Sequence, residues 1–511
     1  MLNQRRSGAV LSYVYIIVNM LVILVYQPFV LRTLGSSEYG LYQLAASVIN
    51  YLTVMDLGFG NGIVVYSTKY RAAGRYEEEK RLLGMFSVIF LGIGAVAACA
   101  GVVIALNAGR IFAASLTAAE IAKSKILMLI LSANVGMTFA FTIYGNIIIS
   151  HERFVFSKLV TILRVLLNPL IMLPLLLLGA DSVAMVSVLA AVNAVCLLSN
   201  YIYCRKKLGV RVRFAGFDKK LFLTIFSFSV FIFMTEVVDK INWYVDQAIL
   251  GVVSGTREVT VYSMASNYNQ MVLLVSSALA SVMLPKISAM VARGVGDRKL
   301  SDEFIKVSRL QFFTVFFIAS GFVLFGKEFV VWHAGEICAR SYYVAALLIC
   351  GALIPITQTV ATSIVQAKNL FRPRACITLV MALFNVAISI PLAMRFGSVG
   401  SAAGTALALV IANGVAMNIY YAKWCGIDIA GYWKNILRIL PGTVAPITVG
   451  VLFRVFVPIN AVWKFIVGVA LYSAIYALSM WLVSFNTYEK GIFMGVLRKI
   501  TGGKINADRN A

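Results

Sequence analysis

Long apolar runs without charge, separated by short polar segments, dominate this chain from end to end. The first lies between Arg6 and Arg32, and ten more follow before the carboxyl-terminal tail. Three further segments, at about 40–67, 159–179 and 221–253, are apolar except for isolated charges. Because about 20 apolar residues cross a bilayer as a helix, the pattern predicts fourteen transmembrane helices and an all-α polytopic membrane protein.

The composition agrees with this pattern and excludes a water-soluble globular protein. Of the 511 residues, 60% are hydrophobic and 13% are charged, whereas an ordinary soluble domain carries about 25% charged residues. The net charge of +24 comes largely from Lys and Arg in alternate loops. The positive-inside rule therefore predicts that both termini are cytoplasmic. Basic residues scattered over every inner loop suit anionic lipid headgroups, so we predict no nucleic-acid partner.

The chain resembles itself when it is shifted by about 217 residues, which indicates an internal duplication. The spacing T-x6-N-x5-P occurs in both copies, and a chance match between apolar segments is the alternative. An even number of spans separates the copies, so both enter the membrane in the same sense. We predict two pseudo-symmetric six-helix lobes at 1–208 and 209–430, two extra helices at 431–485 and a basic cytoplasmic tail at 486–511. The matched pairs are Phe154 with Phe371, Thr161 with Thr378, Asn168 with Asn385, and Pro174 with Pro391.

The seventh predicted span carries four charges on one helical face. These are Glu236, Asp239, Lys240 and Asp246. Each costs about 2.5–3.5 kcal/mol at the centre of a membrane helix, so this face must meet water or partner charges rather than lipid. Glu236 and Lys240, four residues apart, could neutralise each other and only hold helices together. Asp239 and Asp246 would remain unpaired, which makes the acids of this span candidates for proton or cation coupling.

Arg164 is the sharpest candidate for anion binding. It lies in the fifth predicted span on one face with Thr161 and Asn168, just before two prolines that interrupt the helix. A guanidinium stays protonated and matches phosphate through paired hydrogen bonds. The alternative is that Arg164 extends back to the cytoplasmic interface near Lys158, about two helical turns away.

Uncharged polar residues form matching stripes in the second and eighth spans, where they either bind a ligand or join helices. Asp56 follows the first stripe and precedes G-F-G-N-G at 58–62. This sequence predicts close packing or a break in the helix rather than a nucleotide-binding loop. A buried carboxylate beside such a break is a further candidate for taking up a proton. The stripes are Gln43, Ser47 and Asn50, and Ser263, Asn267 and Gln270.

No cofactor and no metal site are predicted. The two histidines, His151 and His333, and the seven scattered cysteines offer no metal-ligand spacing. The predicted outer loops are too short to hold a catalytic domain, and no glycine-rich phosphate loop occurs. Duplicated six-helix halves with polar faces and proline breaks therefore favour a secondary carrier over an enzyme, with an ion channel as an alternative.

Four short segments resemble the polysaccharide-transport proteins, the O-antigen flippase (Wzx-like) branch of the MATE-like multidrug, oligosaccharidyl-lipid and polysaccharide flippase superfamily. They are L-R-T-L-G-S-S-E-Y-G-L-Y-Q-L at 31–44, M-D-L-G-F-G at 55–60, S-H-E-R-F at 150–154 and D-Q-A-I-L-G at 246–251. The resemblance implies two six-helix lobes around a cationic cavity in the bacterial inner membrane. It also implies that alternating access moves a polyprenyl-pyrophosphate-linked oligosaccharide from the inner to the outer leaflet. Such cargo serves O-antigen (lipopolysaccharide), capsule or exopolysaccharide synthesis, with a polysaccharide polymerase and glycosyltransferases as candidate partners.

Together these patterns predict a carrier without enzymatic activity, in which cavity residues hold pyrophosphate and sugars while carboxylates couple transport to an ion. Two alternatives stay open: a MATE-type multidrug or organic-cation antiporter, and a non-transporting scaffold of a polysaccharide-synthesis complex. The seventh span has three acids and one base, which leaves the sign of the cavity open. The candidates for substrate binding are Arg164, Lys240, Asn168, Asn267, Gln270, Gln43 and Asn50, and those for ion coupling are Asp56, Glu236, Asp239 and Asp246.

Overall fold

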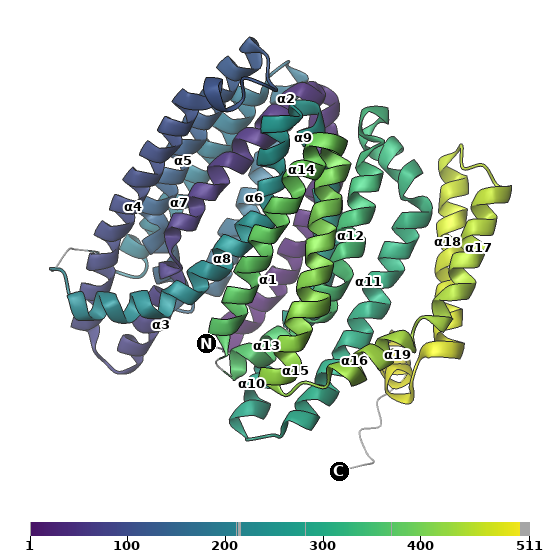
Figure 1. Cartoon of the computed structure of the whole chain (residues 1–511). Coiled ribbons are helices and arrows are strands. Elements are labelled where there is room, and N and C mark those ends of the chain that lie inside the picture. The colour runs from purple at the N-terminus through teal and green to yellow at the C-terminus, as the bar shows by residue number, and fades with distance from the viewer. Residues whose placement is uncertain (1, 211, 213–215, 282, 369, 501–511) are drawn as a thin grey trace. The chain divides into compact units, whose positions relative to one another are not determined.

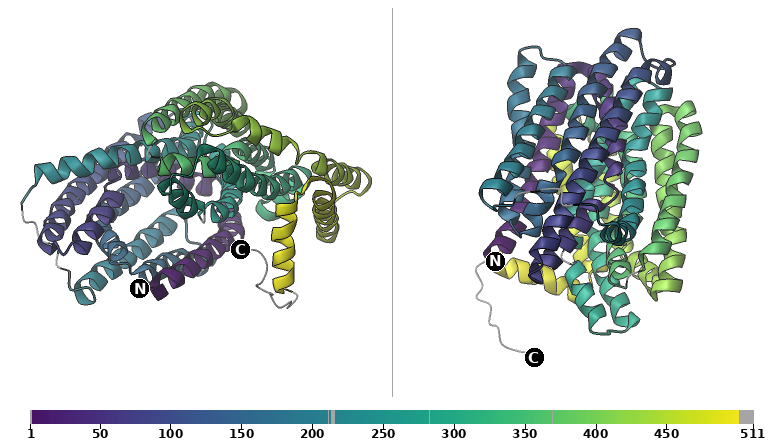
Figure 2. Two further views of the ribbon diagram at one scale, coloured as in Figure 1. Left: turned by 90° about the horizontal axis from the view of Figure 1, so that it is seen from below. Right: turned by 90° about the vertical axis from the view of Figure 1, so that its left-hand side faces the viewer.

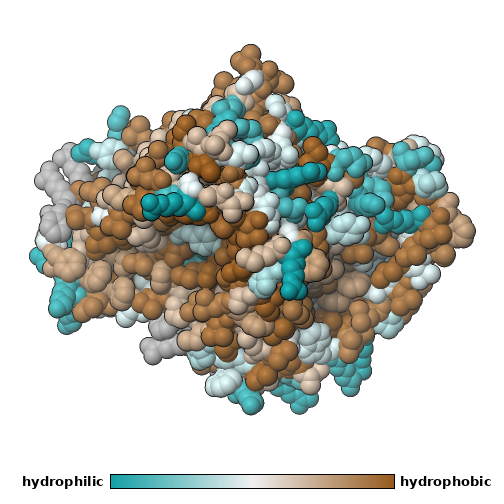
Figure 3. Space-filling view, turned by 45° about the horizontal axis from the view of Figure 1, so that its top comes forward, coloured by the Kyte–Doolittle hydropathy of each residue, from teal (hydrophilic) through white to brown (hydrophobic). Residues whose placement is uncertain are grey.

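The computed structural model describes the chain apart from residues 1, 211, 213–215, 282, 369 and 501–511, and the described residues form helices without a strand (Figure 1). This confirms the predicted all-α class. Large apolar side chains such as Leu91, Val103 and Leu106 are exposed along α4 (Tyr76–Ile111). Apolar residues also cover much of the face drawn in Figure 3. Helices with such surfaces lie against lipid, so this is a multi-pass membrane protein.

The described residues divide into two compact units. Unit 1 contains Met1–Leu274, His333–Gly351 and Phe371–Ala412. Unit 2 contains Val275–Trp332, Ala352–Leu370 and Asn413–Ala511. These units are defined by contacts rather than by the repeat, so the predicted lobe boundaries stay a prediction.

The long helices of unit 1 pack through small residues where they approach closely, and Figure 2 shows them from two sides. A Cβ atom on Gly94 of α4 would lie 2.7 Å from the carbonyl oxygen of Gly136 on α5, so glycine lets these two backbones meet. Helix α8 packs against α14 and also against α2. The elements are α1 (Leu2–Leu21), the π-helix η1 (Val22–Tyr26), α2 (Gln27–Asn50), the 3-10 helix η2 (Tyr51–Asp56), α3 (Phe59–Ala72), α4, α5 (Ala118–Ser150), α6 (Phe154–Leu177), α7 (Ser182–Lys206), α8 (Lys219–Val253), η3 (Glu336–Cys338) and α14 (Phe371–Ile411), together with most of α9 (Thr256–Ser281) and of α12 (Ser341–Thr357).

Aromatic contacts and one buried ion pair organise unit 2. The Tyr472 ring stacks on Phe317 with centroids 5.6 Å apart, which joins α18 to α11. Arg309 of α11 pairs with Glu489 of α19, with Nε and Oε1 2.6 Å apart. The elements are α10 (Met283–Ala292), α11 (Asp297–Ala334), α13 (Thr359–Ala367), the π-helix η4 (Ala412–Ala416), α15 (Met417–Cys425), α16 (Ile429–Leu437), α17 (Pro441–Phe456), α18 (Val462–Ser479), the π-helix η5 (Met480–Ser484) and α19 (Thr487–Ile500).

Two long helical stretches bend at glycines. Gly35 (φ 81°, ψ 166°) lies inside α2, and Gly397 (φ 62°, ψ −139°) lies inside α14. A side chain rarely adopts these angles, which explains why glycine occupies both bends. Within the described residues, nine stretches are long and apolar enough to cross a membrane, or ten if the bent pair α16–α17 is one span. Two of these stretches, Val10–Ala72 and Pro373–Cys425, are each long enough for two crossings of about 20 residues. The count of fourteen spans stays a prediction.

Two local features agree with the sequence patterns. Helices α6 and α14 begin at Phe154 and Phe371, the pair that the repeat aligns, which supports the duplication. After Asp56, Leu57 and Gly58 adopt left-handed conformations with φ of 53° and 70°, and α3 begins at the next residue. The helix break predicted at G-F-G-N-G is therefore confirmed.

Candidate functional site

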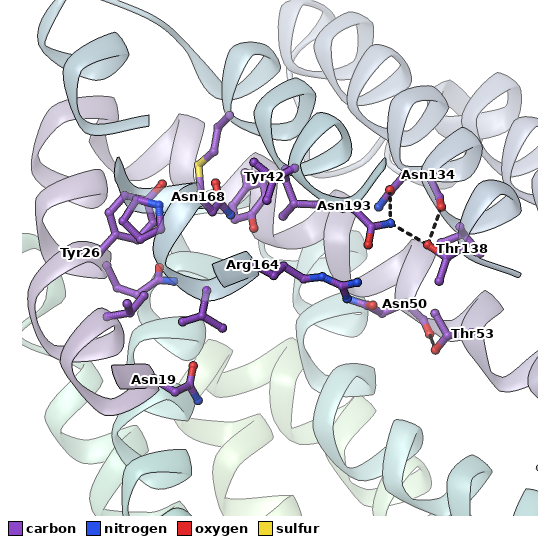
Figure 4. A pocket seen from close by; sticks show the side chains of 18 of the residues that line it. Asn19, Tyr26, Tyr42, Asn50, Thr53, Asn134, Thr138, Arg164, Asn168 and Asn193 are labelled. Atoms are coloured by element: carbon purple, nitrogen blue, oxygen red, sulfur yellow. Dashed lines mark hydrogen bonds between the residues drawn. The ribbon is translucent and has the colours of Figure 1, made fainter. Parts of the chain in front are cut away.

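A cavity of about 560 Å³ lies within unit 1, among the helices of the first repeat (Figure 4). Its volume falls within the range of about 300–1,000 Å³ that is typical of small-molecule sites. The π-helix η1 contributes Val22 and Tyr26 to the wall, and π-helical turns of this kind are frequent at functional sites. The polar lining consists of Asn19, Gln27, Asn50, Thr53, Asp56, Asn134, Thr138, Thr142, Arg164, Asn168 and Asn193, together with Tyr26 and Tyr42.

Arg164 brings a positive charge into this cavity. It lies one turn before Asn168 on α6, so both side chains lie on the same helical face and line the same wall. Its side chain is exposed and extends toward Asn50 in Figure 4. Among the described residues, Arg164 forms no ion pair and no hydrogen bond. A guanidinium without a partner among these residues suits anion binding, which stays a prediction for Arg164.

Three amides of the lining also have no side-chain partner in the described part of the chain. The side chains of Asn19, Asn50 and Asn168 form no hydrogen bond with any other described residue, and Asn168 Oδ1 is completely shielded from solvent. An amide that stays unsatisfied within a membrane-crossing segment costs free energy. Water or a polar ligand in the cavity is therefore needed to satisfy these groups.

Three further residues form a hydrogen-bonded triad on another wall of the cavity. Asn193 Nδ2 of α7 donates to Asn134 Oδ1 at 2.7 Å and to Thr138 Oγ1 at 2.8 Å, as the dashed lines in Figure 4 show. Asn134 and Thr138 are one turn apart on α5 and face the same side. Sequence reasoning missed this triad, although the i, i+4 spacing on α5 was a weak signal.

Asp56 supplies the negative charge of the cavity. It stands at the end of η2 and lines the same cavity as Arg164. The structure therefore brings four of the predicted residues into one cavity, namely Asp56, Asn50, Arg164 and Asn168.

The remaining polar-stripe residues do not line this cavity. Gln43 Nε2 donates to Tyr39 Oη at 2.8 Å, and that hydroxyl donates to Gln27 Oε1 at 2.8 Å. Gln43 is therefore connected to the lining residue Gln27 through the Tyr39 hydroxyl. Asn267 and Gln270 lie on α9, outside the lining.

The charged face of α8 also lies outside the lining. No ion pair within 4 Å joins Glu236 to Lys240 in the described part of the chain, and the Lys240 ammonium lies 5.0 Å above the Tyr244 ring. Asp239 is exposed and interacts electrostatically with Arg374 as well as with Lys240. This cavity therefore does not gather the charges of both repeats, and the roles of Glu236, Asp239 and Lys240 stay predictions.

Asp246 belongs to a second polar cluster, away from the cavity. It is 1% exposed and accepts hydrogen bonds from Tyr262 Oη at 2.5 Å, and from Ser401 Oγ and Thr405 Oγ1 at 2.7 Å each. Asn385 Oδ1 extends the cluster by accepting from Ser389 and lies 3.1 Å from Thr405 Oγ1, while Asn385 Nδ2 is buried without a partner among the described residues. The cluster joins α8, α9 and α14. Its members on α14 were missed because only the tertiary structure brings them to Asp246.

The helical membrane fold is similar to the folds of solved membrane transporters. The chain is similar to the lipid II flippase MurJ in an inward closed conformation, with a TM-score of 0.68 and 15% identity over 96% of this chain and 99% of that one. It is also similar to a multidrug resistance MATE family transporter of the MOP superfamily in an inward-facing conformation. The TM-score is 0.65, with 14% identity over 82% of this chain and 95% of that one. A third similar structure is a MOP superfamily transporter from Pyrococcus furiosus, described as having a binding pocket of reverse polarity. Its TM-score is 0.59, with 13% identity over 83% of this chain and 94% of that one.

The sequence itself identifies the family. The model of the polysaccharide biosynthesis protein family matches residues 5–291, which is more than half of the chain, and the protein belongs to this family. A comparison with curated protein sequences gives no match. The family and the fold agree with the resemblance found in the sequence.

Proposed function

We propose that this protein is a flippase that moves a polyprenyl-pyrophosphate-linked oligosaccharide from the inner to the outer leaflet of the bacterial plasma membrane. The cargo would serve synthesis of a cell-surface polysaccharide, and both termini would lie in the cytoplasm. The observation that carries the proposal is Arg164, which has no partner in the described part of the chain and lines a polar cavity of a MurJ- and MATE-like fold. Membership of the polysaccharide biosynthesis family supports a glycan cargo.

Arg164 is proposed to hold the pyrophosphate. Its guanidinium offers five N–H donors in a planar fork, and none of them is used by a described residue. The unpaired amides beside it, Asn50 and Asn168, suit the hydroxyl groups of a sugar. The polyprenyl chain would stay in the bilayer while the two lobes alternate their access.

Asp56 links anion binding to protonation in this scheme. Its carboxylate shares the cavity with Arg164, so a bound pyrophosphate would bring a second negative charge nearby. Like charges in a poorly solvated site favour the protonated carboxyl. Arrival of the anion would therefore be accompanied by proton uptake at Asp56, and Glu236 is a second candidate for this role. Asp239 stays a further candidate for this role.

Asp246 is proposed as a second coupling site, for a small cation or a proton. A buried carboxylate surrounded by hydroxyl and amide oxygens supplies the oxygen ligands that hard cations prefer. Each hydroxyl that now donates to Asp246 can turn and present its lone pairs to a cation. Occupation of this site would change the packing of α8 against α14.

The decisive experiment replaces Arg164 in a strain that lacks the chromosomal copy. Arg164→Ala should abolish surface glycan and cause lipid-linked oligosaccharide to accumulate, while Arg164→Lys should restore part of the export because it keeps charge but not the fork. Lys158→Ala, on the same helix but outside the cavity lining, is the matched control. Normal export by Arg164→Ala, Lys240→Ala and the double variant, at normal membrane abundance, would refute the proposal.

A multidrug or organic-cation antiporter is the second candidate, and the MATE-like fold favours it. The Arg164 guanidinium, which has no partner among the described residues, opposes it, because a cationic drug close to this side chain would be repelled. Changed drug sensitivity without accumulation of lipid-linked oligosaccharide would support the antiporter. Purified protein in liposomes separates both transporters from a scaffold, which would move no lipid-linked cargo.

A further inference from the structure

We infer that Asn134, Thr138 and Asn193 form a subsite that recognises the acetamido group of an N-acetylated sugar through hydrogen bonds. This inference rests on the proposed function, because it assigns specificity within the same cavity. All three residues line the cavity that contains Arg164, yet they lie on α5 and α7 rather than on α6 (Figure 4). The phosphate-binding group and the triad are therefore on different walls.

The hydrogen bonds fix which way each amide points. The Thr138 hydroxyl donates to the backbone oxygen of Asn134 at 2.8 Å, so its proton is committed to its own helix. The Asn193 atom facing that hydroxyl must then be a donor, which identifies it as Nδ2. Because Asn193 Nδ2 also faces Asn134, the Asn134 atom opposite it must be the acceptor Oδ1.

The fixed orientation leaves one acceptor and one donor for a ligand. Both hydrogens of Asn193 Nδ2 are used within the triad, so its Oδ1 remains as an acceptor. Asn134 uses Oδ1 within the triad, so its Nδ2 remains as a donor; neither free atom is hydrogen-bonded to a described residue. An acetamido group carries the complement, since its N–H fits Asn193 Oδ1 and its carbonyl fits Asn134 Nδ2.

The triad is also rigid before any ligand binds. Asn193 is only 6% exposed, and two hydrogen bonds to α5 hold its side chain in one rotamer. A ligand that pairs with a preorganised amide does not have to order it first. A site built in this way discriminates strongly against an analogue that lacks the matching group, because its own polar atoms are then left unpaired.

Binding measurements on the full-length protein in lipid nanodiscs test the inference. The probes are polyprenyl pyrophosphate, polyprenyl-pyrophosphate glucose and polyprenyl-pyrophosphate N-acetylglucosamine. The unsubstituted protein should bind the N-acetylated lipid at least about tenfold more tightly than the glucose lipid. Asn193→Leu should remove this preference, and Arg164→Ala should weaken all three lipids while keeping it.

Asn134→Asp is the second variant, chosen to preserve folding. It keeps Oδ1 as the acceptor for Asn193 and replaces the remaining amide donor by a second carboxylate oxygen, which repels the acetamido carbonyl, so the preference should fall although the triad stays intact. Ser187→Ala on α7, whose hydroxyl donates to its own helix outside the cavity lining, is the matched control.

The outcomes separate the two proposals. Equal affinity of the unsubstituted protein for the glucose and N-acetylglucosamine lipids overturns the subsite, and so does an unchanged preference in Asn134→Asp. In either case tight binding of polyprenyl pyrophosphate leaves the proposed flippase function standing. Failure of the unsubstituted protein to bind any of the three lipids overturns both.

Discussion

Removal of the Glu489 carboxylate should release the carboxyl-terminal helix from unit 2. Arg309 is 4% exposed and Glu489 is 2% exposed, so neither charge has access to water if its partner is lost. The pair is bidentate, with Nε–Oε1 at 2.6 Å and Nη2–Oε2 at 3.0 Å, and Arg309 also donates to the backbone oxygens of Asn435 and Ser484 at 2.9 Å each. These contacts tie α11 to α16, η5 and α19 at a single side chain.

The magnitude follows from the uncompensated charge. Loss of one partner of a buried pair costs about 3–5 kcal/mol, so Glu489→Ala should raise the population of detached α19 by a factor of at least about 100. Glu489→Gln should cost less, because the amide oxygen still accepts one hydrogen bond. Replacement of both residues, as Arg309→Met with Glu489→Leu, should recover much of the loss, since no unpaired charge remains.

Limited trypsin digestion of the purified protein measures this directly, because cleavage after Lys490 requires α19 to open. Thermal unfolding of the same samples provides an independent measurement. Thr487→Ser in the same helix is the matched control, because the Thr487 side chain is exposed and takes no part in the ion pair. It should leave the rate of cleavage within α19 unchanged. If the double variant is as unstable as Glu489→Ala, the loss of stability does not arise from the unpaired buried charge of Arg309, and the reasoning is refuted.

Three further predictions concern unit 1. Gly40→Val should lower membrane abundance and export, because a Cβ atom at this position would collide with the Thr256 carbonyl oxygen. Gly92→Ala is the control, because open space surrounds Gly92. It should leave abundance on immunoblots and export unchanged. Asp246→Asn should abolish the dependence of liposome transport on an imposed proton or sodium gradient, and an unchanged dependence would exclude Asp246 from coupling. Burial raises the pKa of the Asp181 carboxyl, but hydrogen bonds from Lys123 and from backbone amides outweigh burial and lower it overall. The stabilisation by Asp181 is thus present at neutral pH and is lost as the pH falls through the folded-state pKa, so Asp181→Asn should flatten the acid limb of a thermal-stability profile.

Features set by local sequence could be predicted, and those set by tertiary contacts could not. Uncharged runs identified the helical membrane class, and the repeat aligned Phe154 with Phe371, where α6 and α14 begin. Arg164 and Asn168 were found because one helical turn separates them on a single helix. The break after Asp56 followed from closely spaced glycines, which adopt left-handed conformations at little cost.

The triad and the Asp246 cluster needed the structure. Asn134 and Asn193 are 59 residues apart in the chain and meet only because α5 packs against α7. Ser401 and Thr405 are small polar residues in an apolar helix, and nothing in their sequence context indicates that they reach a carboxylate on α8. Helical faces alone were also a poor guide, since they placed both Arg164 and Lys240 in the predicted cavity although only Arg164 lines the one described here.

The two asparagines that the repeat aligns lie in unlike surroundings. Asn168 borders an open chamber, whereas its counterpart Asn385 is 1% exposed and bonded to Thr405 and Ser389. The two aligned positions therefore serve different surroundings. A chimera that carried residues 1–208 twice would lack Asp246 together with Ser401 and Thr405, which donate hydrogen bonds to it.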